Sequence, residues 1–244
     1  MNNTQTLERM KELRLHGMHD SYLNAIETGV IYDFKPDEIT AHLIEAEYED
    51  KADRKIRRLI GNAQFRIIAQ LEDIKYTPTR NLNKSQVLKL SELKWLEKGE
   101  NIMITGFTGT GKTYLCCAFG LKACLHGYRT VYYNTNKLFY LLKEARSCGN
   151  YLRTFEKIIK KDLIIIDDFG LDILDKESRM ILFELLEERT GNKSMIVSSQ
   201  IPVENWYDVI GDKTIADAVC DRLLSHSQFI NLEGDSMRKF REKS

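Results

Sequence analysis

The chain reads Gly106-Phe107-Thr108-Gly109-Thr110-Gly111-Lys112-Thr113 in one unbroken stretch, a match to the pattern G-x-x-x-x-G-K-[ST] at every fixed position. An apolar run, Asn101–Thr105, precedes it, and an apolar-periodic segment, Tyr114–Leu125, follows it. This order predicts a strand, a tight loop and a helix. Glycines let the loop curl so that its backbone N–H groups point at phosphate oxygens, next to the positive end of the helix. The stretch therefore predicts binding of a nucleoside triphosphate.

Every residue of this loop, from Gly106 to Thr113, is a candidate contact for ATP. Lys112 is expected to reach the β- and γ-phosphates, and the Thr113 hydroxyl is expected to coordinate Mg²⁺. A chance glycine-rich turn before a helix is the alternative, and the flanking apolar segments argue against it. ATP and Mg²⁺ are accordingly the cofactors that the sequence predicts.

A second apolar run, Leu163–Ile166, ends in two carboxylates, Asp167 and Asp168. An acid at the carboxyl end of a strand beside the loop strand can hold the Mg²⁺ that bridges the β- and γ-phosphates, and we assign this role to Asp167. Asp168 is then placed to orient or polarise the attacking water as a general base. Without the phosphate loop, two acids at a strand end would equally well be solvated groups.

Two further candidates follow these acids in the sequence. The apolar run that begins at Met195 ends in Ser199 and Gln200. In ATPases with an extra strand between the loop strand and the acidic strand, such an end carries a polar sensor of the γ-phosphate or the water, and an ordinary strand-to-loop transition is the alternative. Arg222, on a predicted helix over 216–225, is either paired within its own domain or projects into a neighbouring subunit's site, where it neutralises transition-state charge.

Secondary-structure patterns divide the chain into three parts. Residues 1–75 show helical spacing of apolar residues, most clearly after Pro36, and predict an N-terminal helical domain that binds a partner. Residues 76–100 break up at Pro78 and a polar stretch, which indicates a linker. Residues 101–244 alternate strands and helices, as in a P-loop α/β fold whose parallel sheet is sandwiched by helices. The expected strands are 102–105, 130–134, 163–167, 195–199 and 229–232.

Composition limits the function. The chain has 244 residues, 43% hydrophobic and 30% charged, an ordinary balance for a globular protein. No apolar run approaches the roughly 18 residues that span a membrane, and the N-terminus lacks a secretion signal, so we expect a cytoplasmic protein without a membrane partner. Five cysteines without C-x-x-C spacing indicate small buried side chains. Because the net charge is zero, any binding of nucleic acid must come from local patches.

The order of four motifs resembles the IstB-like transposition helper ATPases of insertion sequences, AAA+ proteins related to DnaC-type helicase loaders. The motifs are G-F-T-G-T-G-K-T, I-I-I-D-D-F-G, V-S-S-Q-I-P-x-x-x-W and D-R-L-L, and the similarity runs from about Ile67 to the C-terminus. It implies an ATPase that forms a homo-oligomer on double-stranded DNA and engages a transposase. On this resemblance Arg222 matches the arginine finger and Arg238 a second phosphate sensor. Gln200 stands where the family commonly has Asn, and Asp168 where many AAA+ ATPases have Glu.

The resemblance also implies a DNA-facing segment after the second strand. Cations there would line the inner surface of a ring or spiral of subunits and contact phosphates without reading sequence. A basic run at Lys51–Arg58 on a predicted helix is a second candidate, and solvated helix faces are the alternative for both. The candidates after the second strand are Lys137, Lys143, Arg146, Arg153 and Lys157.

Three other functions fit parts of the pattern. A replicative helicase loader of the same fold would bind a hexameric helicase in place of a transposase. A small-molecule kinase needs a mobile lid with several arginines, whereas Arg222 alone lies between Gln200 and Leu232. A nucleotide-switched adaptor would bind ATP without hydrolysing it. The transposition helper predicts ATP hydrolysis that rises with duplex DNA and with protein concentration.

Overall fold

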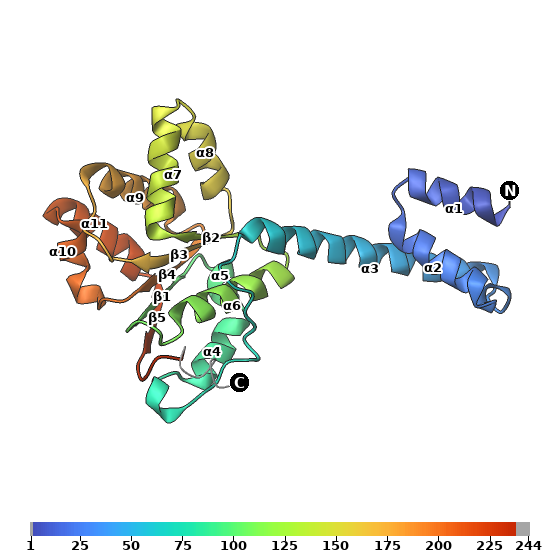
Figure 1. Cartoon of the computed structure of the whole chain (residues 1–244), viewed down its shortest axis with the longest axis horizontal. Helices are drawn as coiled ribbons and strands as arrows, with labels where there is room; N and C mark the ends of the chain where they lie inside the picture. The colour runs from blue at the N-terminus through green and yellow to red at the C-terminus, as the bar shows by residue number, and fades with distance from the viewer. Residues whose placement is uncertain (1, 238–244) are drawn as a thin grey trace. The chain divides into compact units, whose positions relative to one another are not determined.

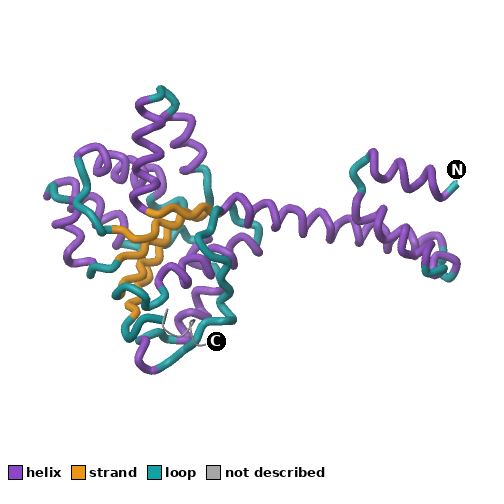
Figure 2. The backbone as a smooth tube through the Cα atoms, viewed as in Figure 1, coloured by secondary structure: helices purple, strands orange, loops and turns teal. Residues whose placement is uncertain are grey.

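The computed structural model describes residues 2–237 of the chain. The chain divides into two compact units, Met1–Arg58 and Leu59–Ser244. Figures 1 and 2 trace the helices and strands of both. Helix α3 (Pro36–Ala63) is continuous through the boundary. No helix in the described part of the chain is both long and apolar enough to cross a membrane.

In its described residues, the first unit contains helices joined by short turns and no strand. Its α2 packs closely on α3, because Gly17 has no side chain: a Cβ there would lie 2.2 Å from the Ala46 carbonyl oxygen. Next to this crossing, the buried Glu47 carboxylate accepts the Met18 backbone N–H at 3.2 Å and pairs with Lys51 at 3.3 Å. Burial alone would raise the pKa of Glu47, and these partners lower it overall. The helices are α1 (Asn3–Glu12), α2 (His16–Glu27), a 3₁₀ turn (Val30–Tyr32) and the first part of α3.

Helix α3 ends at Ala63, about a dozen residues before the end of the helical pattern expected from the sequence. Gln64 turns the chain with a φ of 55°, in the left-handed region. Phe65 then packs on helix α6 (Lys112–Leu125) at Gly120, where an added Cβ would lie 2.5 Å from the ring. The following residues run without helix up to a 3₁₀ turn at Pro78–Arg80, since apolar residues among them are buried in the core of the second unit.

A five-stranded parallel sheet forms the centre of the second unit, in the order β2-β3-β4-β1-β5. Strand β4 lies between the loop strand β1 and the acidic strand β3, with Ile196 paired to Ile102 on one side and to Ile165 on the other. Each of the five expected strands is present. Their bounds are β1 (Asn101–Gly106), β2 (Thr130–Asn134), β3 (Leu163–Phe169), β4 (Ser194–Ser199) and β5 (Ser227–Leu232).

Helices cover both faces of the sheet (Figure 1), which confirms the expected sandwich. Ile164 and Ile166 of β3 belong to the core on the side of α7 to α11. Leu163 and Ile165 belong to the core on the side of α4 and α6, as the alternation of side chains along a strand requires. The remaining helices are α4 (Lys84–Ser91), α5 (Lys94–Glu97), α7 (Thr135–Ser147), α8 (Tyr151–Ile159), α9 (Lys176–Arg189), α10 (Trp206–Ile210) and α11 (Lys213–Leu224).

Residues 76–100, expected as a linker, form α4 and α5 and belong to the compact unit that holds the sheet. Val87 and Trp95 are buried in its core, and the Trp95 indole N–H donates to the Leu90 carbonyl at 2.9 Å. Asn83 caps α4 by accepting the Ser85 backbone N–H at 2.8 Å. The polar stretch after Pro78 therefore marks a turn and a helix cap. The unit with the sheet begins at Leu59.

Candidate nucleotide-binding site

The phosphate loop joins β1 to α6 in a conformation that its glycines permit. Gly109 and Gly111 have φ values of 87° and 100°, which strain any residue with a side chain. Gly106 lies against β5, and a Cβ there would approach the Leu232 carbonyl oxygen to 2.2 Å. The Lys112 ammonium reaches back over the loop and donates to the carbonyl oxygens of Gly106 at 2.7 Å and of Phe107, the next residue, at 3.0 Å. A glycine-rich loop followed by the first turn of a helix is an arrangement suited to an anion.

Asp167 is fully buried at the end of β3, and three hydroxyls donate to its carboxylate. Thr113 and Tyr132 bond to Oδ2 at 2.8 and 2.7 Å, and Ser198 bonds to Oδ1. Burial, and then the hydrogen bond to Asp167, raise the pKa of the Tyr132 phenol and keep it protonated as a donor. Because the donors come from α6, β2 and β4, the position of this acid is set by three elements.

The chemistry of Thr113 and Asp167 fits Mg²⁺, because a hydroxyl and a carboxylate are the hard oxygen ligands that this ion prefers. In the described part of the chain no group of three or more His, Cys, Asp or Glu side chains could hold a metal. Mg²⁺ commonly takes one or two protein oxygens and completes its shell with phosphates and water. The pair therefore suits a metal that arrives with a nucleotide.

Asp168 differs from its neighbour in exposure and in partners. Its φ of 60° is unusual for a residue with a side chain, and such strained positions are common at functional sites. Its backbone N–H donates to the Ser198 hydroxyl at 3.2 Å. Its Oδ2 accepts the Asn134 amide at 3.3 Å and lies 3.6 Å from Nη1 of Arg66. The carboxylate lines a cavity beside the loop, where a water could reach it.

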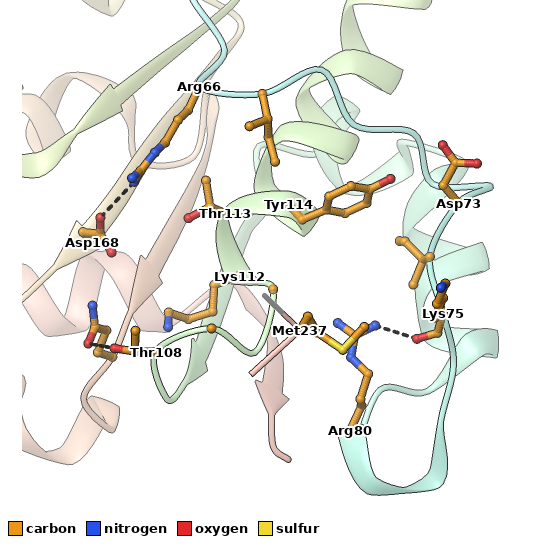
Figure 3. Close-up of a pocket in the computed structure, with 15 residues that line it drawn as sticks. Arg66, Asp73, Lys75, Arg80, Thr108, Lys112, Thr113, Tyr114, Asp168 and Met237 are labelled. Atoms are coloured by element: carbon orange, nitrogen blue, oxygen red, sulfur yellow. Dashed lines mark hydrogen bonds and ion pairs between the residues drawn. The ribbon is translucent and has the colours of Figure 1, made fainter. Parts of the chain in front are cut away.

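This cavity has a volume of about 740 Å³, within the usual range of roughly 300–1,000 Å³ for small-molecule sites. Figure 3 shows Thr108, Lys112, Thr113 and Asp168 around it. Gln200 is a further lining residue. The other lining residues belong to no motif, and the sequence did not predict them as part of the site. Six of them precede β1, where the sequence offers no local signal for a site. The missed residues are Arg66, Ile67, Asp73, Ile74, Lys75, Arg80, Tyr114 and Met237.

Arg80 links the phosphate loop to the segment before α4 by hydrogen bonds. Its buried guanidinium donates to the Thr110 carbonyl at 3.0 Å and to the Lys75 carbonyl at 2.5 Å. A Cβ on Gly111 would lie 2.9 Å from this guanidinium, so the glycine also makes room for Arg80. Burial lowers the pKa of Arg80, although an arginine still keeps its charge.

Of the two sensor candidates, Gln200 lies at the cavity and Ser199 does not. Oε1 of Gln200 accepts the Thr108 hydroxyl at 2.6 Å, which ties the end of β4 to the phosphate loop. Ser199 is fully buried, and its hydroxyl donates to the Phe169 carbonyl at 2.8 Å. The position of β4 between β1 and β3 is the strand order on which the sensor interpretation depends.

Arg222 does not line the cavity. Its guanidinium bonds to the Glu187 carboxylate of α9, donates to the Ala218 carbonyl at 2.9 Å and lies 5.0 Å from the centre of the Phe183 ring. The sequence left two alternatives for Arg222, an ion pair within its own domain or a contact with a neighbouring subunit's site. In the single chain Arg222 forms the ion pair within its own domain, with Glu187. Arg238, expected as a second phosphate sensor, lies outside the described residues.

The five basic candidates for DNA contact differ in their partners. Lys143 pairs with Asp175 at 2.6 Å, and Arg146 pairs with Glu177 at 3.3 Å. The other three are exposed and make no ion pair with another described residue, so their charge is available to a ligand. They are Lys137, Arg153 and Lys157.

The strand order, the loop after β1 and the acids at the end of β3 define the class of this protein, a P-loop AAA+ fold. Solved structures agree with this class. The DnaC helicase loader is similar with a TM-score of 0.61 and 16% identity, over 70% of this chain and 99% of that one. AMPPCP-bound DnaA from Aquifex aeolicus is similar with a TM-score of 0.58 and 21% identity, over 74% and 56% of the two chains. At sequence identities this low, the similarity to these two structures indicates a shared fold and nothing further.

The family described as IstB-like ATP binding protein matches residues 8–244, and the chain belongs to this family. A relative from Sinorhizobium fredii, named as an insertion sequence ATP-binding protein, is 35% identical over 234 residues, 96% of each chain. A relative from Geobacillus stearothermophilus, named in the same way, is 29% identical over 236 residues, 97% of this chain and 94% of the relative. The family expected from the motifs is therefore confirmed.

Proposed function

We propose that this chain is a DNA-binding AAA+ ATPase that assists transposition by assembling on target DNA and engaging a transposase. The observation that carries the proposal is the cavity bordered by the phosphate loop, Asp168 and Gln200, with the Thr113–Asp167 pair adjoining it. Phosphoryl transfer to water needs a phosphate cradle, ligands for Mg²⁺, a base and a sensor, and we assign these roles to the residues at this cavity.

The chemistry follows from these positions. The loop N–H groups and Lys112 bind the β- and γ-phosphates, and Thr113 with Asp167 hold Mg²⁺. When bound, the metal neutralises charge on the phosphate oxygens. Asp168 orients a water toward the γ-phosphorus and accepts its proton. Gln200 contacts the γ-phosphate or that water. Its hydrogen bond with Thr108 connects this contact to the phosphate loop.

We assign Arg222 to the site of a neighbouring subunit. The ion pair of Arg222 with Glu187 is partly exposed, and such pairs are worth about 0–1 kcal/mol, so a phosphate of the neighbour's ATP can replace Glu187. A mixing experiment tests this. Asp168→Ala and Arg222→Ala are each expected to lose ATP hydrolysis, and an equimolar mixture is expected to regain part of it, because some interfaces then combine an intact Asp168 with an intact Arg222. A mixture as inactive as its components would contradict the assignment.

Exposed cations after β2 are proposed to contact the DNA backbone. Arg153 and Lys157 lie four residues apart on α8 and so share one face of the helix. Replacing both with Ala should reduce the slope of log affinity against log salt by about two. Lys143→Ala is the matched control, since Asp175 already neutralises Lys143, and it should change the slope less. Equal slopes in all three proteins would contradict these contacts.

The partner is proposed to bind the N-terminal helical part of the chain, residues 1–75. Full-length protein on duplex DNA with ATP should retain a transposase, and a variant truncated before residue 59, where the second unit begins, should not. Retention of a hexameric replicative helicase in place of the transposase would favour the function of a helicase loader. The similarity to DnaC indicates only a shared fold and does not itself support that function.

The proposed function is tested most directly by the rate of ATP hydrolysis per subunit. We expect the rate to rise when duplex DNA is added and when the protein concentration is raised, since a neighbouring subunit completes the site. A rate that stays flat in both titrations would overturn the proposal. Phosphate transfer to a small acceptor, instead of release as inorganic phosphate, would favour a kinase.

A further inference from the structure

Four cationic side chains line the nucleotide cavity, and they differ in exposure. Arg66 is 54% exposed, lies 3.6 Å from Oδ2 of Asp168 and also lines a second cavity, of about 660 Å³, beside the end of β2. Lys75 is exposed as well. Lys112 and Arg80 are buried. Water can solvate the charge of the two exposed cations, whereas the two buried ones depend on the protein or on a ligand.

The charge of Arg80 has no acidic partner. Its guanidinium forms no ion pair with any carboxylate among residues 2–237. Its two hydrogen bonds go to neutral acceptors, the carbonyl oxygens of Lys75 and Thr110. A guanidinium has five N–H donors, so further donors remain, and the one on Nε has no partner. Because a buried charge is costly unless an opposite charge offsets it, an anionic ligand would stabilise Arg80.

The nearest acid in this part of the fold does not supply that opposite charge. Glu233 follows β5, and its backbone N–H donates to the Arg80 carbonyl at 3.1 Å. Its carboxylate instead accepts the side-chain amides of Asn81 and Asn231, each at 3.1 Å. Arg80 itself ends the 3₁₀ turn at Pro78–Arg80, and its side chain is held by the two carbonyls. The guanidinium is therefore fixed in position and short of an anion.

Arg80 lies toward the end of the cavity that is remote from Asp168. Figure 3 shows Asp168 at one side, Lys112 in the middle, and Arg80 and Lys75 toward the other side. Nη2 of Arg80 lies 2.9 Å from where a Cβ on Gly111 would be, so it borders the phosphate loop. In the proposed function, Asp168 serves the γ-phosphorus and Lys112 the β- and γ-phosphates. The next phosphate along a nucleotide is the α-phosphate, which places it on the side of Arg80.

We propose that Arg80 binds the α-phosphate of the nucleotide, in addition to linking the phosphate loop to the segment before α4. N–H groups that the two carbonyls leave free donate to an α-phosphate oxygen, and the phosphate supplies the anion that the buried guanidinium lacks. ATP and ADP both contain this phosphate, so Arg80 contributes equally to the binding of each. The proposal rests on the ATP binding of the family and on the phosphate positions proposed above, and it requires neither DNA nor a transposase.

The test measures the affinities of ATP, ADP, AMP and adenosine for the full-length protein, by competition against a fluorescent ATP analogue. Each added phosphate gives one ratio of affinities, and the ratio of AMP to adenosine isolates the α-phosphate. Arg80→Gln should lower this ratio by about tenfold or more, the scale of a hydrogen bond between charged groups. It should leave the ratios of ADP to AMP and of ATP to ADP close to those of the wild type.

A second readout uses ATP in which sulfur replaces one of the two non-bridging oxygens on the α-phosphorus. Sulfur is a weaker hydrogen-bond acceptor than oxygen, so the wild type should prefer one of the two diastereomers, and this preference should shrink in Arg80→Gln. Arg80→Lys keeps a point charge but loses the planar fork, so it should retain much of the AMP-to-adenosine ratio and still change the diastereomer preference.

Thermal melting of every variant checks its folding. If Arg80→Gln fails to fold, the diastereomer preference of Arg80→Lys decides the test. Lys89→Gln is the control, because it replaces an exposed lysine of α4 that lines neither cavity, and both of its readouts should equal those of the wild type.

Two results would overturn the inference. The first is an AMP-to-adenosine ratio and a diastereomer preference that stay at the wild-type values in the Arg80 variants. The second is a loss spread equally over the α-, β- and γ-phosphate ratios, because that pattern indicates that Arg80 only supports the loop. A wild-type protein that binds ATP but hydrolyses none, with or without DNA, would remove the proposed function and leave this inference standing.

Discussion

The Thr113 hydroxyl donates a 2.8 Å hydrogen bond to Oδ2 of Asp167, and so joins the end of the phosphate loop to the end of β3. Tyr132 donates to the same oxygen at 2.7 Å, and Ser198 to the other. The two protein oxygens of the proposed Mg²⁺ site therefore already lie side by side. Changes at this pair should affect metal binding before they affect the fold.

Asp167→Asn should abolish most ATP hydrolysis, with a loss of about 100-fold or more, the scale on which one electrostatic group contributes to catalysis. The amide keeps the shape of the acid but is a poor ligand for Mg²⁺. Its NH₂ group replaces either the oxygen that accepts the Thr113 and Tyr132 hydroxyls or the oxygen that accepts the Ser198 hydroxyl. Nucleotide affinity measured with and without Mg²⁺ should become nearly equal. Tyr132→Phe is the control, because it removes one donor and keeps the carboxylate, and it should retain Mg²⁺-dependent binding. Normal hydrolysis by the Asn variant would contradict the assignment of the metal ligand.

Gly109→Ala should weaken nucleotide binding and lower stability by about 1–3 kcal/mol, the cost of a strained backbone with a side chain at positive φ. The new Cβ would also lie 2.2 Å from the Ser236 hydroxyl oxygen. Gly61→Ala is the matched control, because this glycine of α3 has open space around it and should gain up to about 1 kcal/mol in helix propensity. Urea unfolding and titration with a fluorescent ATP analogue measure both effects. Equal behaviour of the two variants would mean that the loop tolerates a side chain.

Arg80→Ala should lower the free energy of unfolding by about 2 kcal/mol, because the buried carbonyl oxygen of Thr110 and the partly buried one of Lys75 lose a charged donor. ATP affinity should fall as well, since the loop loses the contact that holds Thr110. Arg57→Ala provides the comparison: this arginine is 71% exposed and 3.9 Å from its acidic partner, so its loss should cost less than about 0.5 kcal/mol. Unchanged ATP affinity in Arg80→Ala would show that the loop holds its shape alone.

Asp175 predicts a dependence of stability on pH. The hydrogen bond with Lys143, and then those with Ser178, lower the pKa of Asp175 from 3.8 to about 2. Because the folded pKa lies below the ordinary value, the carboxylate stabilises the fold fully above a pH of about 4, and this contribution is lost as the pH falls toward about 2. The side chain is largely exposed, so the contribution is below about 1 kcal/mol.

Asp175→Asn isolates the charge in this prediction, since Asn still caps α9, and its deficit in urea unfolding should be present near neutral pH and shrink below a pH of about 4. Asp175→Ala also removes the cap and should cost about 1 kcal/mol more at every pH. A deficit of Asp175→Asn that grows as the pH falls would contradict the sign of this linkage.

The strands and the phosphate loop could be predicted because their causes are local. A continuous apolar run such as Leu163–Ile166 fits a strand buried on both faces, and the structure places alternate residues of this run in two different cores. The loop pattern includes the glycines that its positive φ values demand. By contrast, helix α3 ends at the turn at Gln64 although the helical pattern continues, and Phe65 after the turn packs on the distant Gly120.

Residues that act on the loop or on its acids from elsewhere in the chain could not be predicted. Arg80 bonds to Thr110, thirty residues further on, and Arg66 contacts Asp168 across about one hundred residues. Neither arginine belongs to a periodic pattern or a motif, and each gains its role only from the partner that folding brings beside it. Arg222 shows the same limit, because the pair it forms with Glu187 depends on how α11 packs on α9.

By itself the sequence determined the fold class, the phosphate loop and the acids that end β3, because backbone conformation and burial patterns act over a few neighbouring residues. Only the tertiary structure decided that Gln200 and not Ser199 lies at the nucleotide cavity, that Arg80 bonds to the phosphate loop, and that Arg66 lines two cavities. These choices depend on which side chains meet when distant segments pack. The physical reason is that hydrogen bonds and ion pairs act over a few ångströms of space, whatever the separation along the chain.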